Sequence, residues 1–520
     1  MLKVFFKFFF VIVNIWFFTY GGGEGYCGDS LSLSGKYKDY NVILVILDAM
    51  RPDHLSCYGY AKETSPNIDQ LAKEGIIFTN AFSQSHNTLP GVASIFSSLY
   101  PTSHGMEHIF KDKFPPNVYT LAEILNIYGY KTAWFGSLND PYSGSAVGLL
   151  SGFDEKYNLK PDYTDLFSFI KGHNKEQFLM TIHSYSAHEL HLFDYKPETD
   201  SKKFNALLED LKKFFIKKWE YMRYACENNT DEFDKIFGIG WSKKHVEYFM
   251  QPYSRDNLNK IIALQDSRPK KNSLAYILRV DSIWSFYASM NNEDFLSIIS
   301  LLDNVIYQLD KNLIGGLIAA LKEANINDKT IIIITADHGN AYREHGLIFG
   351  HGQFLYDEII RVPLIFYLPH LNKAVKINSL AQNIDIMPTI LDLLGILSPH
   401  NVQGICLTGL IDGKPGALVN DYVFAKSLIG SFAIRSKRWK LIRKNINAES
   451  IADGDELYDI LKDPLEKDNL INIELGMAKI LKSELKTKIF SLPVYNKGNS
   501  EFIPEIDSES RERIKKTGYW

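Results

Sequence analysis

The chain has 520 residues, of which 45% are hydrophobic and 23% charged, and a formal net charge of -4. This composition is that of an ordinary globular protein with a large core and more than one domain, and it excludes an intrinsically disordered chain. The slight negative charge gives no support for a nucleic-acid surface, so we expect no nucleic-acid partner. An anionic substrate stays open, because a bound metal ion can supply positive charge.

Residues 1–30 form a targeting segment. Lys3 and Lys7 supply a positively charged start, and residues 8–20 form a dense apolar run that is followed by glycines. The run is short for a membrane-spanning helix, so we expect a cleaved secretory signal, with a membrane anchor as the alternative. The protein is therefore expected to be exported, either to the periplasm or cell envelope or out of the cell. The four cysteines lack CxxC spacing, which excludes a zinc knuckle.

Strand and helix patterns alternate from residue 38 to residue 400, which we take as a catalytic domain. Residues 41–47 are rich in Val and Ile, as in a strand buried on both faces of a parallel sheet. We predict further strands at residues 76–81, 131–135, 177–183, 330–335 and 364–368, and helices at residues 67–73, 88–98, 119–127, 295–321 and 385–394. Residues 195–285 carry no recognisable signature and are predicted to be an insertion or lid. The alternation predicts an α/β sandwich with a mostly parallel central sheet and helices on both faces.

The pattern changes in residues 401–520, which we predict to form a smaller C-terminal subdomain. Short runs in which apolar and polar residues alternate are typical of an antiparallel sheet with one solvated face. They occupy residues 422–426, 431–435 and 439–443, and a helix is predicted at residues 473–492.

Acidic residues and a histidine stand at the ends of two of the predicted strands. Asp48 follows residues 41–47, and Asp337 and His338 follow residues 330–335. In an α/β sheet such strand ends meet at one crevice, so these residues are candidate ligands of one metal ion. The alternative is that Asp48 only caps a helix and His338 only fills a turn.

Thr88 begins a predicted helix, where backbone N–H groups and the helix dipole favour a phosphate or sulfate group. A threonine hydroxyl is a poor nucleophile and needs a base or a metal ion. The alternative is an N-cap two residues before Pro90. His86 lies close by and is either an assisting residue or an ordinary loop histidine.

Two further groups of histidines are candidates for proton transfer. His183, His188 and His191 follow the strand at residues 177–183, and one of them could protonate a leaving-group oxygen; we assign no role to His191. His351 lies between two glycines, which permit close approach to a ligand but also simply make a turn.

Together these features resemble the sulfatase family within the alkaline-phosphatase superfamily. The resemblance covers nearly the whole chain except the insertion, and its blocks occur in the family order. They are NVILVILDAMRPDHLSCYGY, SPNIDQLAKEGIIFTNAF, TLPGVASIFSSLYPTSHG, GFDE, TIIIITADHGNAYREHGL, GHGQFLYDEIIRVPL, NIDIMPTILDLLGI and ELYDILKDPLEKDNL.

The resemblance implies an alkaline-phosphatase-like sandwich with a small C-terminal antiparallel sheet, and hydrolysis or transfer of sulfate or phosphate ester groups. It implies that Asp48, Asp337 and His338 bind a metal ion, that Thr88 is both metal ligand and nucleophile, and that His188 assists the leaving group. His351 lies close to a position where sulfatases carry a lysine. One divalent ion (Ca, Mn or Zn) is the expected cofactor.

The chain departs from the family pattern at several positions. Sulfatases carry a Cys/Ser-x-Pro-x-Arg block whose first residue is oxidised to formylglycine, whereas residues 88–92 read TLPGV here. Ala49 replaces a second metal aspartate, and residues 136–139 read GSLN in place of Gly-Lys-Trp-His. A second metal would need an Asp near Ser184 or Ser186, so we expect one metal ion.

These departures favour the branch of the superfamily that uses threonine directly as nucleophile on phosphate esters. We therefore expect Thr88 to attack phosphorus or sulfur, with His188 and His351 assisting the leaving oxygen. The substrate is expected to be a small-molecule, glycan or lipid-headgroup ester. The alternatives are a sulfatase that works without formylglycine and a binding protein that has lost its catalysis.

Overall fold

The computed structural model describes residues 32–107, 112–138, 147–188, 290–347, 349–371, 374–447 and 454–495, with a few more between 206 and 220. The expected leader, His191 and almost all of the expected insertion at residues 195–285 lie outside these described residues. Among the described residues, no helix combines the length and the hydropathy needed to span a membrane.

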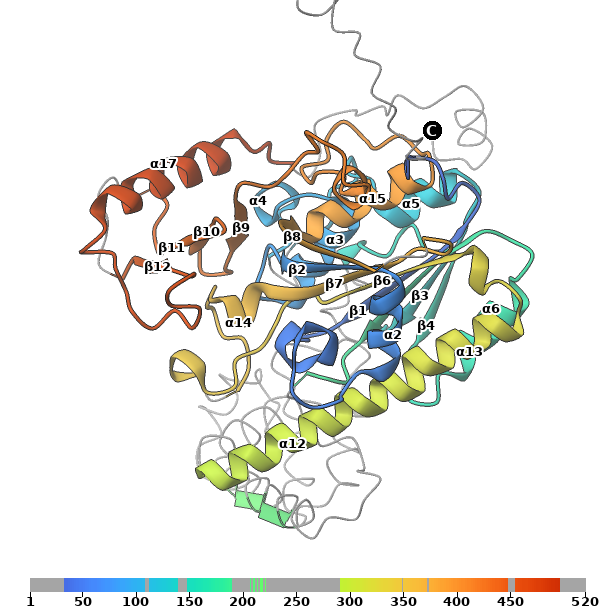
Figure 1. Cartoon of the computed structure of the whole chain (residues 1–520), viewed down its shortest axis with the longest axis horizontal. Helices are drawn as coiled ribbons and strands as arrows, with labels where there is room; N and C mark the ends of the chain where they lie inside the picture. The colour runs from blue at the N-terminus through green and yellow to red at the C-terminus, as the bar shows by residue number, and fades with distance from the viewer. Residues whose placement is uncertain are drawn as a thin grey trace, which may run out of the picture.

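An eight-stranded sheet lies at the centre of the molecule, with strands in the order β4-β3-β5-β1-β6-β7-β2-β8 (Figure 1). All seven residues of β1 are buried, and the strand pairs in parallel with β5 on one side and β6 on the other. Asn41 fixes this arrangement at the start of β1, because its side chain accepts a hydrogen bond from Phe178 N at 3.1 Å and faces Thr330 on β6. The strands are β1 Asn41–Leu47, β2 Ile76–Phe82, β3 Lys131–Gly136, β4 Glu155–Asn158, β5 Phe178–Ser184, β6 Thr330–Thr335, β7 Arg361–Tyr367 and β8 Val375–Gln382.

The sheet is mostly parallel, as predicted, but β7 runs antiparallel to both of its neighbours, β6 and β2. A parallel connection needs a crossover, usually a helix, whereas an antiparallel partner can be reached by a loop. The chain between β6 and β7 contains only the short helix α14 Asp357–Ile360 and a turn at Glu344–Gly346. The chain therefore returns beside β6 in the opposite direction.

Helices cover both faces of the sheet, as expected. In Figure 1, α3, α5 and α15 lie on one side of the strands, and α2, α6, α12 and α13 lie on the other. The long helix predicted at residues 295–321 is present as α12 and α13, joined by a π-helical turn at Asp310–Gly315. The helices not yet given are α2 Pro66–Glu74, α3 Thr88–Ser97, α4 Pro101–His104, α5 Leu121–Ile127, α6 Thr164–Gly172, α12 Asn292–Leu309, α13 Gly316–Glu323, α15 Ile386–Leu393, α16 Thr408–Ile411 and α17 Leu475–Ser491.

A second, antiparallel sheet of four strands follows, in the order β12-β11-β10-β9, with α17 packed on it. Buried charges connect it to α14, which leads into β7: Lys440 Nζ on β11 lies 2.9 Å from Asp357 Oδ1 on α14, and 2.8 Å from Oε1 of Glu466, which follows β12. The strands are β9 Val423–Lys426, β10 Phe432–Arg435, β11 Trp439–Arg443 and β12 Glu456–Asp459. The small C-terminal sheet is thus confirmed, while the domain boundary at residue 400 stays a prediction.

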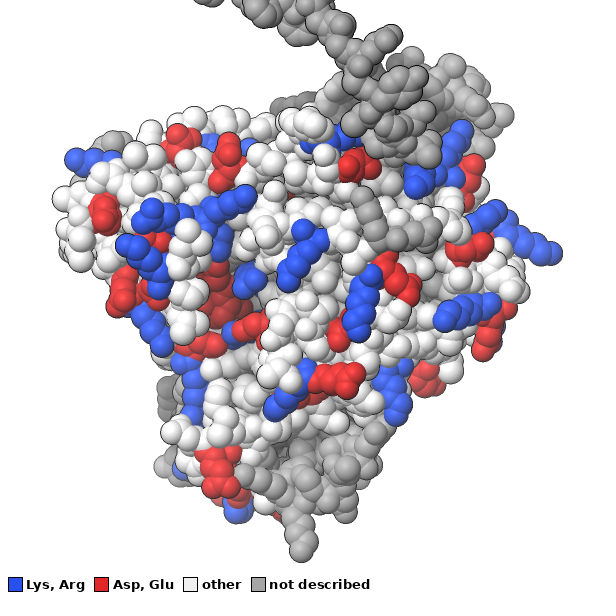
Figure 2. Space-filling view, in the orientation of Figure 1, with Lys and Arg blue, Asp and Glu red and all other residues white. Residues whose placement is uncertain are grey.

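On the face drawn in Figure 2, basic and acidic side chains are interspersed over the surface. That face therefore carries no large patch of a single charge sign.

Candidate active site

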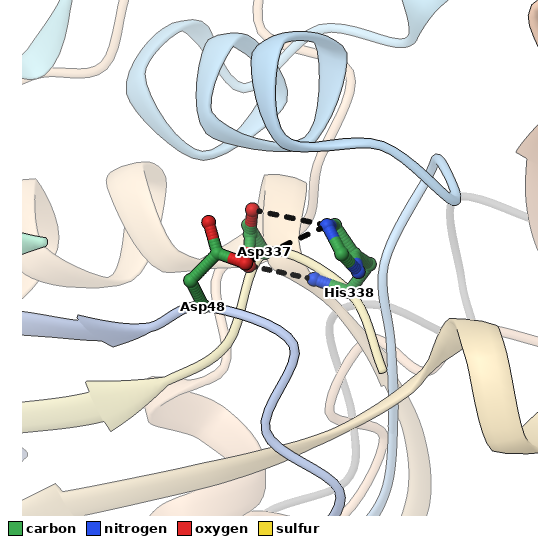
Figure 3. Close-up of side chains that lie close together, drawn as sticks. All are labelled: Asp48, Asp337 and His338. Atoms are coloured by element: carbon green, nitrogen blue, oxygen red, sulfur yellow. Dashed lines mark hydrogen bonds and ion pairs between the residues drawn. The ribbon is translucent and has the colours of Figure 1, made fainter. Parts of the chain in front are cut away.

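Asp48, Asp337 and His338 come together at the carboxyl ends of β1 and β6 (Figure 3). The two strands pair in parallel with Ile46 opposite Thr335, so the residues that follow them lie side by side. All three side chains are buried, and one ligand atom from each lies within 4.8 Å of the others. Among the described residues, this is the group of His, Cys, Asp or Glu side chains placed closely enough to hold a metal ion.

The tautomer of His338 allows this group to hold a cation. His338 Nδ1 lies 2.8 Å from the carbonyl oxygen of Gly339, which can only accept, so the proton sits on Nδ1. Nε2 therefore presents a lone pair, 3.6 Å from Asp337 Oδ2 and 3.8 Å from Asp48 Oδ1. Burial lowers the pKa of His338 to about 4, which keeps the ring neutral. A lone pair facing two buried carboxylates is costly unless a cation lies between them.

Asp337 uses only one of its oxygens within the protein. Its Oδ1 accepts hydrogen bonds from the backbone N–H of Ala49 and of His338, at 3.3 and 3.0 Å. Its Oδ2 is buried and accepts no hydrogen bond from any described residue. Burial raises the pKa of Asp337, and the nearby His183 opposes this rise. A buried carboxylate oxygen that accepts no hydrogen bond is well suited to bind a metal ion.

Thr88 lies beside this group at the start of α3. Its hydroxyl donates to Asp48 Oδ2 at 3.2 Å and lies 3.2 Å from His338 Nε2. Asn87, not Thr88, occupies the N-cap position, and Thr88 is the first helical residue. The capping role considered for Thr88 is therefore wrong, and its hydroxyl is directed to the strand ends instead.

Gly91 allows α3 to approach this closely. A Cβ atom at this position would lie 2.7 Å from the carbonyl oxygen of Asp337 and 3.3 Å from the Cβ of Asp337. Any side chain would thus push the first turn of α3 away from the end of β6. No local sequence pattern marks this glycine as part of the site.

His183, on β5, supports the site in a way that sequence reasoning did not specify. Its Nε2 lies 3.2 Å from Asp48 Oδ2 and 4.0 Å from Asp337 Oδ2, and the side chain is fully buried. The parallel pairing of Ile46 with His183 puts it next to Asp48. The position of His183 at the end of a predicted strand suggested that it belongs to the site. That position alone does not show whether the histidine orients Asp48 or donates a proton.

His188 and His351 lie on the same side of the site. His188 Nε2 is 4.0 Å from Asp48 Oδ1, and the ring of His351 lies 4.4 Å from that of His338 and 5.8 Å from that of His188. Burial lowers the pKa of His351 well below its usual value. The structure therefore brings both expected histidines next to the group formed by Asp48, Asp337 and His338, with His351 as a neutral donor or acceptor.

The departures from the family pattern have structural counterparts. Ala49 adopts a left-handed conformation (φ 58°), which turns its N–H toward Asp337 and gives no second carboxylate. Ser184 and Ser186 bond to each other at 3.0 Å, Oγ to Oγ. Ser137 and Leu138 follow β3, and Asn139 lies outside the described residues.

Comparison with known proteins decides the family. A sequence model described as Sulfatase matches residues 40–396, which is most of the chain. The chain belongs to the sulfatase family. A second model, described as N-sulphoglucosamine sulphohydrolase, C-terminal, matches residues 343–493. This sulfatase-family chain is accordingly a hydrolase of the alkaline-phosphatase superfamily.

Individual relatives of this sulfatase-family chain match along most of their own length. An N-acetylglucosamine-6-O-sulfatase of Bacteroides thetaiotaomicron is 24% identical over 498 residues, covering 85% of this chain and 84% of the relative. Arylsulfatase K of Mus musculus is 23% identical over 472 residues, covering 88% of this chain and 80% of the relative.

Solved structures share the fold. A protein solved in complex with its substrate D-glucosamine-2-N,6-O-disulfate has a TM-score of 0.60 at 20% identity, covering 89% of this chain and 100% of that one. A phosphonate monoester hydrolase of Agrobacterium radiobacter has a TM-score of 0.55 at 20% identity, covering 87% and 95%. At these identities the likeness concerns the fold, and it bears out the expected alkaline-phosphatase-like sandwich.

Proposed function

We propose that this sulfatase-family protein cleaves a sulfate or phosphate ester with Thr88 as nucleophile and one divalent metal ion as cofactor. One observation carries the proposal: the Thr88 hydroxyl lies 3.2 Å from both Asp48 Oδ2 and His338 Nε2. A hydroxyl that merely capped α3 would instead turn back to the helix backbone.

The donor set fits a divalent ion held by Asp48, Thr88, Asp337 and His338. It combines two carboxylates, an imidazole lone pair and a hydroxyl, which suits Mn or Zn as well as Ca. When bound, the ion would lower the pKa of the Thr88 hydroxyl and stabilise charge on the group being transferred. The identity of the ion remains part of the test.

In the first step Thr88 Oγ1 attacks the sulfur or phosphorus atom in line with the leaving oxygen. Its proton passes to Asp48 Oδ2, the acceptor of the Thr88 hydrogen bond. His183, at 3.2 Å from the same carboxylate oxygen, holds Asp48 in place. The N-terminus of α3 adds favourable electrostatics for the anion.

In the second half of the first step the bond to the leaving oxygen breaks. His188 donates the proton that this oxygen needs, and His351 stands beside it as a further donor. Water then attacks the sulfur or phosphorus atom of the covalent Thr88 ester and gives a proton to His188, while Thr88 Oγ1 leaves and takes back its proton from Asp48 Oδ2. The product is the sulfate or phosphate group released to water; an acceptor hydroxyl in place of water gives the transferred ester instead.

The names of the relatives bear on the substrate. Several relatives are named for the removal of sulfate from amino sugars or uronates, so we propose a sulfated or phosphorylated sugar as the substrate class. The positions of the family's sulfate-binding lysines are neutral here, and each missing charged hydrogen bond weakens anion binding by ~1.5–3 kcal/mol. This loss favours a phosphate ester over a sulfate ester.

The test is to assay nitrophenyl sulfate beside bis-nitrophenyl phosphate, with Mn, Zn or Ca added to metal-free protein, followed by N-acetylglucosamine 6-sulfate and 6-phosphate. We expect turnover of the phosphate diester that depends on the metal and is abolished in Thr88→Ala. Thr88→Ser, which keeps a hydroxyl, is the matched control.

Three outcomes would point elsewhere. Turnover of the sulfate esters alone would mean a sulfatase that works without formylglycine. Turnover that survives Thr88→Ala would refute the nucleophile. The lack of turnover of any ester, with metal bound, would mean a binding protein on a sulfatase fold.

A further inference from the structure

His86 lies two residues before Thr88 and is held by a residue far along the chain. The backbone N–H of Leu428 donates to His86 Nε2 at 3.2 Å. A neutral imidazole that accepts at one nitrogen carries its proton on the other, so His86 is protonated on Nδ1. The second sheet thus sets the tautomer of a residue beside the active site.

Leu428 is itself fixed by the turn between β9 and β10. Ser427 N donates to Ser431 O at 2.9 Å, and Ser431 N donates to Ser427 Oγ at 3.0 Å, which closes the turn. At its base, Lys426 N donates to Gln84 O at 2.9 Å, so β9 runs alongside the segment that leads to His86. The donor to His86 Nε2 is therefore part of a closed, hydrogen-bonded turn.

The His86 ring lies close to the active site. The ring is fully buried and lies 5.9 Å from the ring of His351, which is itself 4.4 Å from His338. His86 Nδ1 makes no hydrogen bond within 3.5 Å to any described residue.

We propose that His86 is an anion-binding residue, which donates its Nδ1 proton to a non-bridging oxygen of the sulfate or phosphate group while Leu428 holds its tautomer. The inference rests on the proposed function, because it assigns a further contact to the same substrate group. It gives the site a donor where the family pattern of charged residues is missing. The donor is neutral, and it is positioned by the second sheet.

Two substitutions separate this role from a structural one. In His86→Gln the amide oxygen replaces Nε2 and still accepts from Leu428, but the donor toward the site is lost. In His86→Asn the amide nitrogen stands near Nδ1 and still donates toward the site, but the bond to Leu428 is lost. We measure the affinity of the metal-loaded protein for inorganic phosphate and for sulfate by calorimetry, together with kcat/KM.

We expect His86→Gln to weaken phosphate binding roughly tenfold or more, the size of one hydrogen bond to an anion. His86→Asn should lose less affinity than His86→Gln, although it loses more thermal stability. The reverse order, with Gln near wild type and Asn impaired, would mean a purely structural histidine and would overturn the proposal.

A second measurement does not depend on activity. The protein is prepared with nitrogen-isotope-labelled histidine, and the His86 signals are assigned as those that disappear from the NMR spectrum of His86→Gln. Their nitrogen chemical shifts should show that His86 is protonated on Nδ1. Protonation on Nε2 would overturn the proposal. Wild-type protein that binds phosphate through His86 but turns over neither ester would refute the proposed function and would support this inference.

Discussion

Gly91→Ala tests how closely Thr88, the proposed nucleophile, must lie to Asp48 and His338. The added Cβ would stand 2.7 Å from the carbonyl oxygen of Asp337, whereas ordinary contact begins at about 3.4 Å. Relief of the clash requires α3 to move away from the end of β6 by about 0.7 Å, because a backbone carbonyl cannot rotate aside as a flexible side chain does.

That movement takes the Thr88 hydroxyl out of hydrogen-bond range. If it is fully transmitted, the 3.2 Å separations from Asp48 and His338 become about 3.9 Å. A misplacement of this size costs up to roughly 100-fold in rate, and overpacking costs about 1–3 kcal/mol of stability. We therefore expect kcat to fall 10- to 100-fold while the folded structure remains.

The assay is steady-state kinetics on the phosphate diester with saturating metal, together with urea unfolding. Gly172→Ala is the control, because a Cβ at that exposed position of α6 meets nothing within 4 Å. A Gly91→Ala protein with wild-type kcat would show that the approach of α3 to Asp337 does not set the geometry of the reaction.

Three further predictions concern the nucleophile, the metal and a buried acid. Thr88→Ala should lower kcat by at least roughly 10³-fold and Thr88→Ser by far less, measured on the same ester; equal losses would exclude a hydroxyl nucleophile. Asp337→Asn should reduce bound metal from about one ion per chain toward none in elemental analysis of dialysed protein, and unchanged metal content would place the ion elsewhere. Burial raises the pKa of Asp385 to about 7, above the ~3.9 of an unfolded chain, so the folded state holds an extra proton and stability should fall as pH rises from about 4 to about 7. Asp385→Asn should flatten that part of the urea-unfolding profile, and an unchanged slope would contradict this assignment.

The sequence predicts the central strands well and the edge strands poorly. The limits of β1 and β6 agree with prediction, because strands covered on both faces consist of unbroken Val and Ile runs. β4 and β8, at the two edges of the sheet, were missed, since β4 and the first half of β8 contain exposed positions and include Lys and Asn. The antiparallel direction of β7 depends on the path of the chain between β6 and β7, and the amino-acid composition of the strand does not encode that path.

The site residues also include some that the sequence predicts and some that it does not. The meeting of Asp48, Asp337 and His338 was predictable because they lie just beyond the ends of two strands with a strong pattern, β1 and β6. The roles of His183 and Gly91 depend on strand register and on the distance between α3 and β6, which no local pattern contains. The partner of His86 lies 342 residues away in the sequence, so only the folded chain reveals it.

The position of β6 between β1 and β7 has a consequence for how the protein is made. During synthesis β1 meets β5 first, and its other edge stays uncovered until residue 330 emerges. A growing chain shorter than this exposes an Ile- and Val-rich edge, which favours aggregation or chaperone binding. The same late strand brings in Asp337 and His338, two of the proposed cation ligands, so the proposed metal site can form only once the sheet has closed, and a chain that ends before this strand lacks both ligands.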